Sequence, residues 1–147
     1  RALVTVFASA SWNHGEILSG ENPLTGVDLA GTPQDNITPF KLMSGVRLSD
    51  HAGRLWLEYS NRHPKEVERI AEGLIGSRFL IAQDVYGLNG FTVHRVGAGF
   101  EWRRADRYGV GVVVNLDNLT NAFYREQFQF APARGRSFTI GLHLRKL

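Results

Sequence analysis

Apolar and polar residues alternate through six segments of this chain. Successive side chains of an extended strand point to opposite faces, so each alternating segment has one apolar face and one polar face. The segments cover residues 4–13, 40–48, 54–60, 95–103, 108–117 and 137–147. They predict six β-strands of about ten residues, a length with which a tilted strand crosses a bilayer.

The two faces differ in composition beyond their polarity. In "SFTIGLHLRKL", at 137–147, one face carries Phe138, Ile140, Leu142 and Leu144, and the other carries Ser, Thr, Gly, His and Arg. The polar faces combine charged residues with several glycines, whereas sheet surfaces in water favour bulkier polar residues. This composition favours a hydrated, crowded interior, but alternation alone equally describes a soluble antiparallel sheet with one wet face.

The connections between the predicted strands fall into two classes. Two of them, "SDHAG" and "RADR", are short, and three are long, at 18–37, 61–90 and 118–135. Loops of this length are unusual in a compact domain and are usually functional. A strict alternation of short turns with long loops is typical of outer-membrane barrels.

Aromatic residues of the apolar faces stand at strand ends. Those beside the long loops are Trp12, Phe40, Tyr59 and Phe138, and those beside a short turn are Trp102 and Tyr108. Two such groups are expected of aromatic girdles at the two interfaces of a membrane.

Composition adds a few limits. The 147 residues are 43% hydrophobic and 21% charged, which fits one folded domain. No apolar run reaches the roughly 18 residues of a transmembrane helix, and no cysteine is present for a disulfide or a thiolate metal site. The net charge of +3 is dispersed, so no nucleic-acid partner is expected. Because Arg1 stands inside an alternating segment, we expect a piece of a longer protein.

The carboxy-terminal stretch "VVNLDNLTNAFYREQFQFAPARGRSFTIGLHL" resembles the end of TonB-dependent outer-membrane receptors. In that family a strand ending in Asn-Leu leads through a loop with a Tyr and a Pro-Gly-Arg turn into the last strand. The counterparts here are Asn115, Leu116, Tyr124, Pro132, Gly135 and Arg136. The last strand also resembles the family's assembly signal, with Gly141, Leu142 and Leu144 in the matching places. The chain departs from the pattern in the two extra residues of "PARGR" and in ending on Lys146 and Leu147 instead of an aromatic residue.

Upstream, "DNITPFKLMSGVRL" looks like the family's strand that returns from an outer loop. The resemblance implies an all-β fold, an antiparallel up-and-down transmembrane β-barrel segment of about six strands within a barrel of roughly 22. Residues 1–147 would then be the C-terminal portion of that barrel, without the plug domain and the earlier strands.

The resemblance also implies a function and a location. The implied function is active import of a scarce nutrient, such as siderophore-bound iron, cobalamin or an oligosaccharide, across the bacterial outer membrane. The implied partners are outer-membrane lipid, the TonB complex acting through the plug, and the barrel assembly machinery. No cofactor is implied.

Two other functions stay open from the residues themselves. One is a passive porin-like barrel with its remaining strands elsewhere, and the other is a soluble β-sandwich that binds a ligand through its long loops. No enzymatic activity is expected, because the chain has no nucleophile elbow and no phosphate-binding glycine loop. The five histidines are scattered without metal-ligand spacing, at His14, His51, His63, His94 and His143.

Charged residues of the polar faces are candidates for lining a lumen: Arg47, Arg54, Glu58, Arg95, Glu101 and Arg103. They line a substrate path or contact the plug, or they only pair across strands at about 0 to 1 kcal/mol each. Aromatic residues of the long loops are candidate ligand contacts if those loops are extracellular. They are Tyr86, Phe123, Tyr124 and Phe128, and turn packing explains them equally well.

Two loop segments carry local signals. In "HPKEVERIAEGL", Pro64 at a first helical position and the early acids predict a short helix. The tripeptide Asn118-Leu119-Thr120 is formally a glycosylation acceptor. We interpret it instead as a turn at the end of a strand.

Overall fold

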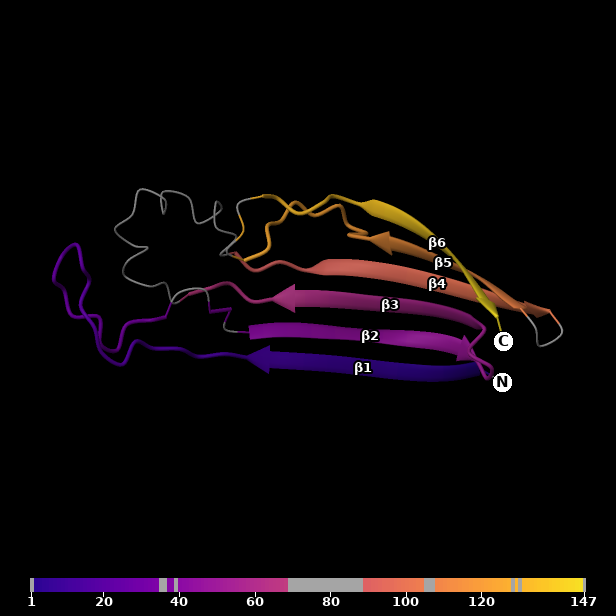
Figure 1. Ribbon diagram of the computed structural model, residues 1–147, viewed down its shortest axis with the longest axis horizontal. Helices are drawn as coiled ribbons and strands as arrows, with labels where there is room; N and C mark the ends of the chain where they lie inside the picture. The colour runs from indigo at the N-terminus through magenta and orange to yellow at the C-terminus, as the bar shows by residue number, and fades with distance from the viewer. Residues whose placement is uncertain are drawn as a thin grey trace.

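Six antiparallel strands form one sheet in the computed structural model, which describes residues 2–34, 37–38, 40–68, 89–104, 108–127, 129 and 131–146 and, of residues 103, 104 and 146, the backbone alone. The strands are β1 (Ala2–Trp12), β2 (Phe40–Asp50), β3 (Leu55–Pro64), β4 (Val93–Arg104), β5 (Tyr108–Asp117) and β6 (Ser137–Lys146). They lie side by side in sequence order, as an up-and-down sheet (Figure 1). All six predicted strands are confirmed, with ends that shift by a few residues.

The sheet is open. Among the described residues β1 and β6 make no contact with each other, so the six strands do not close into a barrel. The hydrogen-bonded register joins apolar residues to apolar residues across all six strands, as in the row Val6, Val46, Tyr59, Val96, Leu116 and Phe138. A slip of one residue would turn every side chain of a strand to the opposite face, so this pattern specifies the register.

The long and short connections lie at opposite ends of the sheet. The described parts of the three long ones, which fall within 13–39, 65–92 and 118–136, are on the left in Figure 1, and the turn at 51–54, the start of β1 and the end of β6 are on the right. In the turn at 51–54, Gly53 has a φ of 65° and donates its N–H to the Asp50 carbonyl at 3.0 Å. Arg54 belongs to this turn and pairs with Asp50 at 4.0 Å, so its prediction as a strand residue is wrong.

The described residues contain almost no hydrophobic core. Val67, which is 5% exposed, and Pro64 are the buried apolar side chains among them. The apolar face of the sheet lies open, with exposed fractions that reach 83% at Leu144. Its large exposed side chains are Val4, Val6, Trp12, Leu48, Leu55, Leu57, Tyr59, Phe100, Trp102, Tyr108, Val110, Phe138, Ile140, Leu142 and Leu144. Water-exposed apolar patches larger than a few hundred Å² are rare in monomeric soluble proteins. We therefore expect lipid or another apolar surface to contact this face.

The apolar residues form a band that crosses the sheet obliquely. One hydrogen-bonded row runs through the middle of the band from Val4 on β1 to Ile140 on β6. On β1 small and apolar residues continue from Val4 towards the long loops as far as Trp12. On β6 they continue from Ile140 in the opposite direction, as far as Leu144. The band is therefore slanted relative to the cross-strand rows.

The helix predicted at Pro64 is wrong over the part that the structure describes. Pro64 is the last residue of β3, and residues 65–68 have no helical structure. The Lys65 N–H donates to the Phe40 carbonyl at 3.0 Å, which extends the pairing of β2 and β3. Pairing with β2 thus overrides the local signal of a proline followed by acids. The remainder of the predicted helix falls outside the described residues. Among those residues no helix is long and apolar enough to cross a membrane.

The turn after β5 is built around Asn118. This side chain is 2% exposed, and its residue has a φ of 53°, which asparagine tolerates better than other non-glycine residues. Its Nδ2 donates to the carbonyls of Ala122 at 2.9 Å and Arg134 at 3.3 Å, and its Oδ1 accepts from the Ala122 N–H at 2.9 Å. The interpretation of Asn118-Leu119-Thr120 as a turn is confirmed, because the buried amide already has three partners.

Replacing Asn118 by alanine should lower the free energy of unfolding by about 2 to 4 kcal/mol. Alanine leaves the bonded backbone groups without their partner, and it adopts the left-handed conformation at a further cost. Asn118→Gly should lower the free energy of unfolding by less than Asn118→Ala. Glycine also loses the hydrogen bonds of the side chain, but it adopts the left-handed conformation without a steric cost. Chemical denaturation of the full-length polypeptide measures both variants. Equal losses for the two would contradict the role of the left-handed backbone.

Candidate functional site

The charged residues of the polar face pair with one another across the strands. The pairs are Arg47–Glu58 at 3.6 Å, Arg95–Asp117 at 3.3 Å and Arg145–Glu101 at 2.8 Å. Most of these side chains are partly exposed, so each pair contributes about 0 to 1 kcal/mol. Four of the predicted lumen residues, Arg47, Glu58, Arg95 and Glu101, therefore share one face. Arg103 stands opposite Gly109 in the backbone register, and its side chain lies outside the description.

Rings fill the space above the glycines of this face. A Cβ built on Gly99 would overlap the Trp56 indole, one on Gly45 would overlap the Phe7 ring, and one on Gly111 would overlap the His143 imidazole. The Arg47 guanidinium lies over the Trp56 ring, 4.2 Å from the ring centroid. Because glycine lets a flat ring approach the backbone, the polar face is a packed surface and not a row of free side chains.

The third long loop, at 118–136, is attached to the ends of β3 and β4. Arg62 donates from Nη1 to Glu126 Oε2 at 2.9 Å, and Gln127 donates from Nε2 to the Lys65 carbonyl at 2.6 Å. The rings of Phe91 and Tyr124 pack with their centroids 4.4 Å apart. This loop is therefore held over the polar face, at the end where the long loops gather.

A cavity of about 380 Å³ lies between this loop and the polar face. Arg62, Arg95, Asp117, Tyr124 and Arg134 are among the residues that line it. The residues that line it carry both positive and negative charges. Both acids of the lining, Glu58 and Asp117, already have an arginine partner. Such a cavity offers hydrogen-bond donors and acceptors to a polar solute.

Of the four predicted ligand contacts the structure describes Phe123 and Tyr124, and these two side chains lie in different places. Tyr124 lines the cavity under the third loop, whereas Phe123 is 76% exposed and points to Arg125, whose guanidinium is 5.4 Å from its ring centroid. Tyr86 and Phe128 lie outside the described residues. No ligand site formed by all four aromatic residues can be described.

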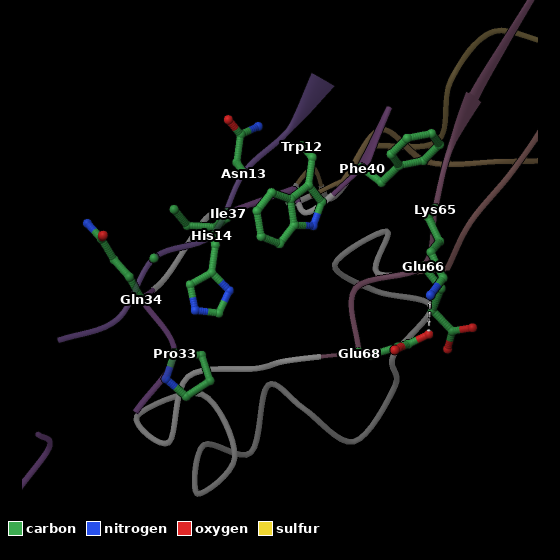
Figure 2. Close-up of a pocket in the computed structure, with 11 residues that line it drawn as sticks. Trp12, Asn13, His14, Pro33, Gln34, Ile37, Phe40, Lys65, Glu66 and Glu68 are labelled. Atoms are coloured by element: carbon green, nitrogen blue, oxygen red, sulfur yellow. Dashed lines mark ion pairs between the residues drawn. The ribbon is translucent and has the colours of Figure 1, made fainter. Parts of the chain in front are cut away.

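A second cavity, of about 390 Å³, lies between the first long loop and residues 65–68. Its lining residues are Trp12, Asn13, His14, Gly15, Pro33, Gln34, Ile37, Phe40, Lys65, Glu66 and Glu68, and we call it the Trp12 cavity. Figure 2 shows the rings of Trp12 and His14 on one side and Lys65 and Glu68 on the other. Trp12 and His14 stack with centroids 5.8 Å apart and planes at 25°.

The Trp12 cavity carries charges of both signs. Lys65 Nζ lies 2.7 Å from Glu68 Oε1, and this hydrogen bond and the charge of the carboxylate raise the pKa of Lys65 above its ordinary value. No local sequence pattern predicts this cavity, because it depends on the register of β1, β2 and β3, which places Trp12, Phe40 and Lys65 in one cross-strand row.

The predicted assembly signal lies on β6. Leu142 and Leu144 are 75% and 83% exposed on the apolar face, and Gly141 lies on the polar face opposite Val113. In the described part of the chain β6 pairs only with β5. The strand therefore presents a free edge together with two exposed leucines.

Neither a metal centre nor a related protein adds to this picture. Across the described ranges no group of three His, Cys, Asp or Glu side chains is placed to hold a metal ion. No family model, no curated protein and no solved structure matches the chain.

Replacing Gly99 by alanine should destabilise the protein by about 1 to 3 kcal/mol, because the new methyl group displaces the Trp56 ring from a packed position. Gly141→Ala is the matched control on the same face. The nearest atom to its Cβ is the Val113 carbonyl oxygen, 3.9 Å away, so little change is expected. Chemical denaturation monitored by tryptophan fluorescence measures both. Similar effects of the two substitutions would show that the ring does not depend on Gly99.

Proposed function

We propose that this chain is the C-terminal part of the barrel wall of a TonB-dependent outer-membrane receptor, which imports a scarce nutrient with energy from the TonB complex. The observation that carries the proposal is the open apolar face, whose slanted band runs from Trp12 to Leu144. Strands of a membrane barrel tilt by about 35 to 45°. A layer of hydrocarbon at constant depth therefore crosses the hydrogen-bonded rows obliquely, as this band does.

The composition of the two faces supports the same proposal. Lipid covers the apolar face in a barrel, and the ion-paired face lines a hydrated interior. Aromatic residues stand where the band ends: Trp12 and Phe138 lie beside the long loops, Trp102 and Tyr108 lie near a short turn, and Tyr59, expected at a strand end, lies in the middle of β3. A soluble sandwich would instead need a second apolar layer over this face, and the described residues supply none.

The two free edges require further strands. In lipid no water is available to unpaired backbone groups, so an open sheet of six strands is excluded from a bilayer. Because the sheet has an even number of strands, β1 and β6 run antiparallel to each other. An even number of further antiparallel strands of the same polypeptide can therefore join the two edges. A barrel of roughly 22 strands has room for a plug domain in its lumen.

A passive porin-like channel shares this wall architecture. The receptor is favoured by the family resemblance of Asn115, Leu116 and Tyr124 and of the assembly signal at Gly141, Leu142 and Leu144. The inward-folded loop at 118–136 also supports a lumen that is restricted at its outer end. The transported nutrient remains one of the three classes of the family: siderophore-bound iron, cobalamin or an oligosaccharide.

An arginine on the apolar face should destabilise the barrel according to its depth. Ile140 stands in the middle row of the band, so Ile140→Arg should cost about 2 to 4 kcal/mol in a bilayer. Leu144→Arg, near the edge of the band, should cost about 0 to 1 kcal/mol, and Thr139→Arg on the polar face is the control. Reversible unfolding of the full-length protein in lipid vesicles gives these values. Equal costs at Ile140 and Leu144 would contradict a bilayer around the band.

The transport function is tested in cells that carry the full-length protein. Uptake of one of the three nutrient classes should require this protein and stop when the TonB complex is inactivated, because import is driven through the plug. Membrane fractionation of the same cells should find the protein in the outer membrane. Uptake that continues without the TonB complex would establish the passive channel, and recovery of the protein in a detergent-free soluble fraction would establish the sandwich.

A further inference from the structure

One cross-strand row of polar side chains lines the cavity under the third loop. The register places Ser60 opposite Arg95, Arg95 opposite Asp117, and Asp117 opposite Ser137. All four residues line this cavity of about 380 Å³. Residues that stand directly opposite each other in a sheet point to the same face. The row therefore presents a hydroxyl, a guanidinium, a carboxylate and a second hydroxyl, in that order, on the polar face.

Much of the hydrogen-bonding capacity around this row is unused. Arg95 contacts Asp117 Oδ1 through Nε, at 3.3 Å, and Nε carries only one of the five N–H donors of a guanidinium. Neither serine hydroxyl of the row has a hydrogen-bond partner among the described residues. Glu58, the other acid of the lining, lies 3.6 Å from Arg47 Nη1, which is too long for a hydrogen bond. The cavity thus keeps donors and acceptors side by side.

The charges around the cavity compensate one another. Arg62 holds Glu126 through both terminal nitrogens, and Arg95 pairs with Asp117. An anion would meet the carboxylates of Asp117 and Glu58, and a cation would meet guanidinium groups, so either charge encounters repulsion. A hydroxyl group is both a donor and an acceptor. A solute with several hydroxyls therefore satisfies both kinds of group without bringing a charge.

The third loop is held in place over the row. The Asn118 side chain, which is 2% exposed, binds the carbonyls of Ala122 and Arg134. Tyr124 packs on Phe91 with centroids 4.4 Å apart and also lines the cavity, so its ring is an apolar surface beside the polar row. Groups that are already fixed lose less conformational entropy when a ligand binds. The cavity is therefore preorganised for a solute with both polar and apolar surfaces.

We propose that the cavity under the third loop binds one sugar ring of a neutral oligosaccharide. Hydroxyls of the ring bond to the row from Ser60 to Ser137, and the C–H face of the ring lies against Tyr124. The volume of about 380 Å³ is near the lower end of small-molecule sites, which span roughly 300–1,000 Å³, so the cavity holds one unit of the nutrient. This inference rests on the proposed function, in which the polar face lines the lumen, and it selects the oligosaccharide among the three nutrient classes.

The test measures binding of uncharged and anionic probes to the full-length protein in detergent micelles by isothermal titration calorimetry. The uncharged probes are trisaccharides of glucose, galactose, mannose and xylose. The anionic probe is trigalacturonate, which has the same length and a carboxylate on each ring. We expect at least one uncharged trisaccharide to bind about tenfold more tightly than trigalacturonate, because a carboxylate that meets Asp117 loses a hydrogen bond to a charged group.

Variants of the row locate the binding. Ser60→Ala should weaken binding of the trisaccharide about three- to tenfold, because one hydrogen bond is lost. Ser49→Ala is the matched control, since Ser49 is a half-buried serine of the same face outside the cavity, and it should leave binding unchanged. Asp117→Asn should weaken the trisaccharide about tenfold and strengthen binding of trigalacturonate, because Arg95 then lacks its carboxylate partner. Denaturation curves like that of the parent protein identify the variants as folded.

The failures of the two proposals are distinguishable. Binding of trigalacturonate in preference to every uncharged trisaccharide overturns the sugar site, and so does binding of none of the probes. Equal losses in Ser49→Ala and Ser60→Ala also overturn it. In each of these cases the receptor proposal stands if nutrient uptake still requires the TonB complex. Uptake that is independent of the TonB complex overturns the receptor proposal, whichever probes bind.

Discussion

One apolar sheet face without a covering layer is the constraint on which this structure depends. In a soluble domain that face would pack on a second layer of structure, but among the described residues Pro64 and Val67 are the only buried apolar side chains. The four inner strands are hydrogen-bonded on both sides, whereas β1 and β6 are hydrogen-bonded on one side only, and the side chains of the apolar face contact no second layer of the described residues. A bilayer provides such surroundings without any second layer of protein. This constraint favours a membrane barrel of either kind, and the motif residues favour a receptor over a passive channel.

The opposite face reaches its stability in a different way. Ion pairs such as Arg95–Asp117 join neighbouring strands, and the rings of Trp56, Phe7 and His143 lie over glycines. Each ion pair contributes little when it is partly exposed. The rings contribute close packing on a face that carries few apolar residues, and the glycines make that packing possible. A hydrated lumen tolerates such a face, because the charged groups keep access to water.

The long loops give the two sides of the sheet different cavities. The loop at 118–136 covers the polar side and is held there by Arg62 and Gln127. The first long loop and residues 65–68 form the Trp12 cavity on the apolar side. In a barrel these would be an inner cavity near the substrate path and an outer cavity at the lipid headgroups.

The sequence by itself determined the six strands, their two faces and the turn at Asn118. A period of two residues is a local property, and the hydrogen bonds of Asn118 reach mainly to the residues that follow it, so both can be recognised from short segments. The short helix expected at Pro64 was wrong because pairing with Phe40 on another strand is a long-range interaction that no local pattern contains. The open sheet, the slant of the band, the inward third loop and the Trp12 cavity were decided only by the tertiary structure. Each of them depends on which residues of different strands lie opposite one another, and that register is fixed by all six strands together.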